Sequence, residues 1–201
     1  MNDRNLYMFI GKKMCNEDVK AIYKMMDLCE TNLLFIDKDC LNELSLFENR
    51  TSEIIDCYDE GNLKNKFELL SQVNNIVLIP SVATCFCVED IMSECRETLT
   101  KIFLVTKAFY RVALSKKNVR VWYVNNIISD EIKNLYVTCA LECFNKGIDS
   151  IALVLGNEFS KKKINVNIIK RTDSCNLEKI EKILSYLSQD ILYMNLQSIL
   201  I

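Results

Sequence analysis

The side chains that most often do chemistry in proteins are unevenly represented in this sequence. It contains ten cysteines and no histidine, which excludes Ser/His and Cys/His nucleophile systems and the commonest acid–base group at neutral pH. No two cysteines have the C-x-x-C spacing typical of zinc sites, and Cys85-x-Cys87 stands alone. We therefore expect no metal site, and we expect thiols that stay reduced and pack as small hydrophobic side chains.

Charge and hydropathy exclude further classes of function. The 201 residues carry a formal net charge of −2, so no positive field would gather phosphates, and nucleic acid is not an expected partner. No apolar run approaches the roughly 20 residues that span a bilayer. The first five residues also lack the basic region and the following apolar run of a signal sequence. We expect no membrane partner and a cytoplasmic location.

The hydropathy pattern indicates the elements that must position any functional group. Short apolar runs alternate with longer stretches of helical spacing, the pattern of parallel strands joined by crossover helices. The expected strands are Leu6–Ile10, Leu33–Asp37, Glu53–Asp56, Ile76–Pro80, Val119–Val124, Ile164–Ile169 and Ser198–Ile201. The expected helices are Glu17–Glu30, Leu63–Val73, Val88–Lys116, Asp130–Phe159 and Asn176–Leu187. No repeat or linker divides the chain, so residues 1–201 are expected to form a single domain.

Three stretches resemble the short-chain dehydrogenase/reductase family, in particular its members that are like 3-oxoacyl-carrier-protein reductase. Residues 103–124 are similar to the family's long central helix and the strand after it, and residues 147–167 to its next helix and strand. Residues 180–201 resemble the last helix and the closing strand. In the second stretch the matching positions are Glu158, Ile164, Val166 and Asn167. The resemblance implies a three-layer α/β fold of Rossmann type, with a doubly wound parallel sheet.

The cofactor-binding turn of that family is altered here. It normally follows the first strand and is rich in glycine, because bare backbone lets a pyrophosphate reach N–H groups at a helix start. Only Gly11 remains, while Cys15 and Glu17 stand where the resemblance puts glycine. Their side chains would fill the approach, and the Glu17 carboxylate would repel a diphosphate. We therefore expect that NAD(P) binding is lost and that no other cofactor is bound.

Other residues near this turn leave a ligand site open. Lys12 and Lys13 could bind phosphate by direct charge, although lysines beside a helix start are more often solvated surface. Asp37, after the second expected strand, stands where an acid could hold a ribose hydroxyl, and it equally suits a turn.

The resemblance also locates the four residues that would do the family's chemistry. These are a tyrosine acid–base, a lysine four residues later that lowers the tyrosine's pKa, a serine and an asparagine. Counted from Glu158 and Asn167, the four positions hold Leu141, Asn145, Asn126 and Thr98, respectively. Moving the register to Tyr136 does not restore the pair, because its fourth neighbour is Ala140. We interpret Tyr136 as a partly buried aromatic residue and expect no catalysis by this chain alone.

The chain between the sixth strand and the last helix is short. About ten residues separate Asn167 from that helix, where active members of the family insert a helical lid of roughly twenty or more residues that closes over substrate. We therefore expect that the substrate lid is deleted.

With an empty cleft, function is expected at surfaces. Family members commonly dimerise through two long helices, here Leu99–Lys116 and Leu141–Phe159, which pair as a four-helix bundle. The interface candidates on them are Phe103, Phe109, Tyr110, Phe144, Ile148 and Ile151. At helical spacing, roughly half of these side chains are expected to pack on the sheet instead.

Three functions are compatible with these features. We favour an inactive subunit that pairs with and stabilises an active paralogue of the same family in a hetero-oligomeric dehydrogenase. A homodimeric scaffold or sensor comes second. The third is a divergent oxidoreductase in which Lys12, Asp37, Asn126 and Asn145 bind another ligand.

Overall fold

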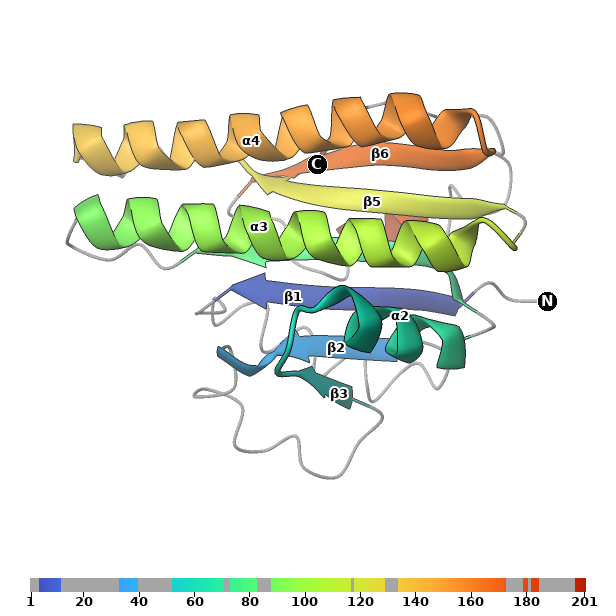
Figure 1. Cartoon of the computed structure of the whole chain (residues 1–201). Helices are drawn as coiled ribbons and strands as arrows, with labels where there is room; N and C mark the ends of the chain where they lie inside the picture. Colours follow the sequence, from blue (N-terminus) through green and yellow to red (C-terminus); the bar gives the residue numbers. More distant parts are fainter. Residues whose placement is uncertain are drawn as a thin grey trace.

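A seven-stranded parallel sheet organises the protein (Figure 1). The computed structural model describes residues 4–11, 33–39, 52–70, 73–82, 88–116, 118–128, 134–172, 179–180, 182–184 and 198–201. The strands are β1 Arg4–Gly11, β2 Leu33–Asp37, β3 Ser52–Ile55, β4 Val73–Ser81, β5 Val119–Asn126, β6 Ile164–Arg171 and β7 Ser198–Leu200. Their order is β3-β2-β1-β4-β5-β6-β7, with every neighbouring pair parallel. All seven expected strands are confirmed.

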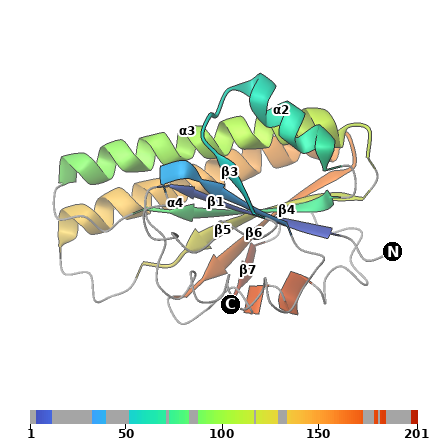
Figure 2. The same cartoon turned by 90° about the horizontal axis from the view of Figure 1, so that it is seen from below.

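Helices cover both faces of the sheet (Figure 2). Helix α2, Glu60–Leu69, helix α3, Val88–Ala113, and helix α4, Leu135–Ser160, lie together on one face. The helical residues 179–180 and 182–184 lie on the other face, where Ile180 and Leu184 are buried. This is the expected doubly wound, three-layer arrangement. The expected helix Glu17–Glu30 lies outside the described residues, and no helix among those described is long and apolar enough to cross a membrane.

Capping side chains set the starts of two helices. The Asp59 carboxylate accepts a hydrogen bond from the Asn62 backbone N–H at 2.9 Å, so α2 begins at Glu60. The Asn134 side-chain oxygen accepts from the backbone N–H groups of Tyr136 and Val137, which fixes the start of α4 at Leu135. This described helix therefore starts later than the Asp130 that periodicity predicts, because periodicity does not detect a cap.

The main core lies between the sheet and helices α2, α3 and α4. Phe67 of α2 packs edge-on against Phe109 of α3, with ring centroids 5.4 Å apart, and it also stacks on Phe35 of β2. Near the carboxyl-terminal ends of α3 and α4, the rings of Tyr110 and Phe159 stack with their centroids 4.2 Å apart. Each fully buried side chain of this size stabilises the fold by roughly 1.5–3 kcal/mol. The Phe67 contacts join α2 to α3 and to the sheet, and the Tyr110–Phe159 contact joins α3 to α4.

Candidate functional site at the carboxyl edge of the sheet

The strand order reverses at β1, which lies between β2 and β4. In open parallel sheets, ligands bind outside the carboxyl ends of the strands at such a reversal. Gly11 ends β1 there, and it pairs with Ser81 at the end of β4. This edge is therefore the first place to search for a functional site.

Gly11 is required there by backbone geometry. Its φ is 139°, and a Cβ atom on it would lie 1.7 Å from the Ser81 carbonyl oxygen. No L side chain fits this approach of β1 to β4. Its N–H donates to the Asp37 carboxylate at 3.1 Å, so the backbone of Gly11 is tied to the end of β2.

The Asp37 carboxylate is buried and balanced by a cation of the same chain. Lys101, from the middle of α3, places Nζ 2.9 Å from Asp37 Oδ2, and the exposed fractions of the two side chains are 13% and 2%. The same ammonium lies 2.7 Å from Asp39 and 3.0 Å from Glu97, and 5.1 Å from the centre of the Tyr58 ring. We call this group, Asp37, Asp39, Tyr58, Glu97 and Lys101, the lysine cluster.

The lysine cluster keeps Lys101 protonated. Burial alone lowers the pKa of Lys101, but its hydrogen bonds with Asp39, Asp37 and Glu97 outweigh burial, and the net effect raises the pKa above its ordinary value. The carboxylate at the end of β2 is thus satisfied by an ammonium and a backbone N–H without any ligand. Sequence reasoning singled out Asp37 and missed Lys101, which lies 64 residues away.

The remaining residues of the expected cofactor turn, Lys12, Lys13, Cys15 and Glu17, lie outside the described residues.

A second polar group forms where β5 and β6 end beneath α4. The Asn145 side chain donates to the Asn126 carbonyl oxygen at 2.7 Å, and Arg171 Nε donates to the Asn126 side-chain oxygen at 2.6 Å. Two of the four positions to which the resemblance assigns catalysis are therefore in direct contact. Next to them, the Asn125 side chain donates to the Asn145 carbonyl oxygen and to the Asp149 carboxylate.

The other two positions, Thr98 and Leu141, lie on helices α3 and α4. Thr98 is 1% exposed on α3, and Leu141 is half-buried against the core. Tyr136 corrects a prediction: it is 70% exposed, not partly buried. It occupies the first turn of α4, which extends beyond the strands at the carboxyl edge (Figure 1). No group of three or more potential metal-ligating side chains occurs among the described residues.

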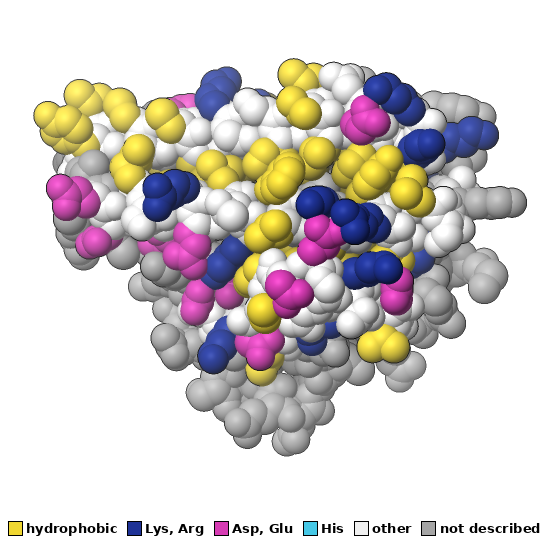
Figure 3. Space-filling model, in the orientation of Figure 1, with side chains coloured by type: hydrophobic (Ala, Val, Ile, Leu, Met, Phe, Trp, Pro, Cys, Tyr) yellow, Lys and Arg dark blue, Asp and Glu magenta, His cyan; other side chains and the backbone are white. Residues whose placement is uncertain are grey.

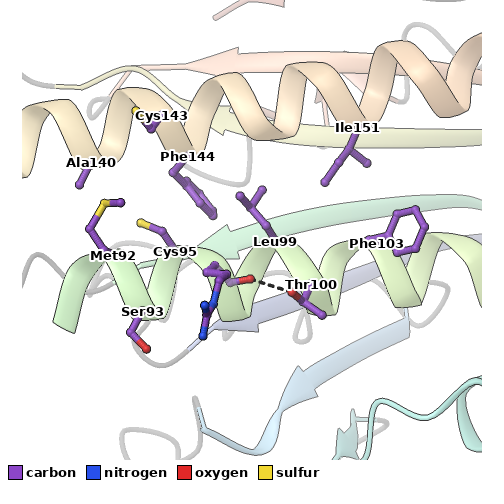
Figure 4. Close-up of a pocket in the computed structure, with 11 residues that line it drawn as sticks. Met92, Ser93, Cys95, Leu99, Thr100, Phe103, Ala140, Cys143, Phe144 and Ile151 are labelled. Atoms are coloured by element: carbon purple, nitrogen blue, oxygen red, sulfur yellow. Dashed lines mark hydrogen bonds between the residues drawn. The ribbon is translucent and has the colours of Figure 1, made fainter. Parts of the chain in front are cut away.

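The outer face of α3 and α4 carries a stripe of hydrophobic side chains (Figure 3). An open, mostly apolar groove of about 740 Å³ runs between the two helices. Residues from both helices line it, including Leu99, Phe103, Cys143 and Ile151 (Figure 4). The helices approach closely at its floor, since a Cβ on Gly147 would lie 2.8 Å from a methyl group of Leu99.

Three of the six interface candidates are buried in the structure, and the other three are at least partly exposed. Phe109, Phe144 and Ile148 are 1%, 5% and 0% exposed, so they belong to the core and correct that part of the prediction. All three belong to the buried core cluster, as helical spacing allows for about half of such a set, and Phe144 also lines the groove between the helices. Tyr110 and Ile151 are partly buried, and Phe103 is 44% exposed. Exposed apolar residues that were not singled out are Met92, Leu135, Leu153 and Val154.

Neither a family model nor a curated protein matches the sequence, whereas many solved structures match the fold. A short-chain dehydrogenase from Leptospira borgpetersenii with bound NAD+ superposes with a TM-score of 0.68 at 13% identity, covering 99% of this chain and 91% of that chain. A putative 3-oxoacyl-reductase from Bacillus thuringiensis gives 0.64 at 15% identity, with 98% and 96% covered. This chain has the short-chain dehydrogenase fold. An NADPH-dependent reductase involved in bacilysin biosynthesis is similar in the same way, with a TM-score of 0.65, 13% identity, and 99% and 98% covered.

Proposed function

We propose that this chain is a non-catalytic protein of the short-chain dehydrogenase fold, the inactive subunit that pairs with and stabilises an active paralogue in a hetero-oligomeric dehydrogenase. The observation that carries the proposal is the contact of Lys101 with Asp37. An acid at the end of β2 is the group that would hold a cofactor ribose in this fold. Here its carboxylate is 2% exposed and already binds Lys101 and the Gly11 N–H. A dinucleotide would have to break those bonds.

The asparagine side chains that meet at the ends of β5 and β6, beneath α4, support the proposed loss of catalytic activity. Asn126 and Asn145 hydrogen-bond to each other and to their neighbours. A carboxamide acts neither as an acid nor as a base near neutral pH, and the Leu141 side chain has no ionisable proton. The described positions at which the resemblance expects a proton relay thus hold side chains that suit a structural role.

The apolar stripe on α3 and α4 supports a role in binding another protein. Phe103 of α3 is 44% exposed, and Leu153 and Val154 of α4 are 55% and 66% exposed. Exposed apolar side chains that gather on one face are typical of interfaces. An active paralogue of the same fold would present two equivalent helices to this face.

Cofactor binding is tested by titrating the purified chain with NADH and NADPH while nicotinamide fluorescence is followed. We expect no saturable change for this chain and a clear one for an intact reductase used as the positive control. Saturable binding to this chain, or measurable reductase turnover by it, would contradict the proposal.

Pairing is tested by co-expression with an intact paralogue from the same genome, followed by size-exclusion chromatography. We expect a mixed oligomer in which only the paralogue binds NAD(P). Phe103→Asp places a charge on the apolar stripe and should abolish the mixed oligomer. Leu69→Asp is the matched control, since Leu69 is 80% exposed on α2 and off the stripe, and this variant should assemble normally.

A homodimer is the second candidate, because charge is distributed unevenly along the same face (Figure 3). The start of α3 carries exposed Glu89 and Asp90, and exposed Lys161, Lys162 and Lys163 follow the end of α4. The two helices run in the same direction. A two-fold axis across the face would therefore bring the acidic end of one copy to the basic end of the other. A dimer of the chain alone that is abolished by Phe103→Asp would favour this candidate.

A further inference from the structure

A row of polar side chains crosses the sheet near the amino ends of four adjacent strands. The register aligns Asn5 with Asn75, Asn75 with Arg120, and Arg120 with Asn165. Successive side chains of a strand point to opposite faces. The next residue of each strand packs in the core beneath α2, α3 and α4: Leu6, Ile76, Val121 and Val166. The polar row therefore lies on the other face of the sheet, one side chain per strand.

Arg120 brings a permanent charge to this row. Its exposed fraction is 5%, and no hydrogen bond or ion pair joins its guanidinium to another described residue. A guanidinium group keeps its positive charge at any ordinary pH. An uncompensated buried charge is strongly unfavourable. The site therefore requires a negative charge that the described part of the chain does not supply.

Asn75, the neighbour of Arg120 in the row, requires a different partner. It is 3% exposed, and its amide nitrogen donates to the Asn5 side-chain oxygen at 2.9 Å. Its own side-chain oxygen is buried and has no hydrogen-bond partner among the described residues. An unsatisfied buried acceptor is unfavourable as well, and it needs an O–H or N–H donor. A cation and an acceptor that no described residue satisfies thus lie on adjacent strands.

We propose that Arg120 and Asn75 form a binding site for a small oxyanion that also carries an O–H group, of which hydrogen phosphate is the simplest. Two oxygens of such an ion accept hydrogen bonds from the two-pronged guanidinium. The O–H group donates to the Asn75 side-chain oxygen. The site lies at the opposite end of the strands from Asp37 and Asn126, so it does not depend on the proposed loss of catalysis.

The test follows thermal unfolding of the whole chain in phosphate and in sulfate, at constant ionic strength and neutral pH. For the wild type we expect phosphate at ten times its Kd to raise Tm by about 3–6 °C. Sulfate has no proton donor at this pH, so it should raise Tm less. Arg120→Met should lose both responses. Arg96→Met, which removes an exposed arginine of α3, should keep them.

Two further variants, Arg120→Lys and Asn75→Leu, keep the proposal falsifiable if Arg120→Met does not fold. Arg120→Lys retains the charge without the two-pronged donor and should weaken phosphate binding at least several-fold. Phosphorus NMR of inorganic phosphate should show broadening with the wild type and less with this variant. Asn75→Leu should retain anion binding but lose the preference for phosphate over sulfate. No Tm response in the wild type, or an equal response in Arg120→Met, would overturn the proposal.

Discussion

Lys101 and Asp37 meet at 2.9 Å although 64 residues separate them in the sequence. The lysine comes from the middle of α3 and the aspartate from the end of β2, so their contact joins a helix to the sheet at the edge where ligands bind in this fold. The pair is almost fully buried. The buried Asp37 carboxylate therefore finds both a cation and a backbone N–H donor within the chain.

Lys101→Met should reduce the free energy of unfolding by about 2–4 kcal/mol, because it leaves the buried Asp37 carboxylate without its cation while retaining a chain of similar length. Asp39 and Glu97 are partly exposed, and water compensates the loss of their contacts. Urea unfolding monitored by circular dichroism measures the change.

Lys64→Met is the control for this substitution. Lys64 lies 3.4 Å from Glu68, but both side chains are about half exposed, so the expected loss is less than about 0.5 kcal/mol. Adding Asp37→Asn to Lys101→Met should recover part of the stability, since the unpaired charge is then absent. If Lys101→Met and Lys64→Met lower the free energy of unfolding equally, the lysine cluster stabilises the protein no more than an exposed ion pair does.

Much of the fold could be predicted from the sequence, because hydropathy reflects burial directly. The run from Val119 to Val124 is apolar except for Arg120, and every residue in it is buried, as expected of a strand covered on both faces. The limits of elements were harder to predict. Helix α4 starts at Leu135 because Asn134 caps it, and a cap depends on a single side chain that leaves no periodic signal.

The candidate site was predicted less completely, because contacts between distant residues have no local signature. Asp37 could be recognised from its place after a strand, but nothing near Lys101 in the sequence indicates the partner. Phe109 and Phe103, six residues apart on one helix, look equivalent as interface candidates. Only the packing shows that the first is buried in the core and the second is exposed.

Gly11→Ala should reduce the free energy of unfolding by more than about 3 kcal/mol, because a Cβ there would overlap the Ser81 carbonyl oxygen in a backbone conformation that alanine rarely adopts. Gly61→Ala, within α2, should change stability by no more than about 1 kcal/mol. The same urea experiment compares the two variants. A small effect at Gly11 would mean that β1 and β4 separate easily at this edge.

Tyr123 and Thr106 form a buried hydrogen bond at 2.9 Å, with the phenol donating to the threonine hydroxyl. Thr106→Val should cost about 1–3 kcal/mol, because it leaves a buried donor unsatisfied, whereas Tyr123→Phe should cost about 1 kcal/mol. The double variant should cost less than the sum of the two single changes. A double-mutant cycle from chemical denaturation measures this coupling, and strict additivity would refute it.

The Cys95 thiol should make the free energy of unfolding fall as the pH increases in the alkaline range. Burial, followed by the nearby Glu94 and Cys143, raises the pKa of the Cys95 thiol from 9.0 to about 11. Between these two values the thiol is ionised in the unfolded chain and still protonated in the folded one, so the unfolded state binds fewer protons and gains stability as pH increases. Urea unfolding across this range should show a shallower decline for Cys95→Ala than for the wild type. Equal slopes for the wild type and Cys95→Ala would show that Cys95 does not titrate as its burial requires.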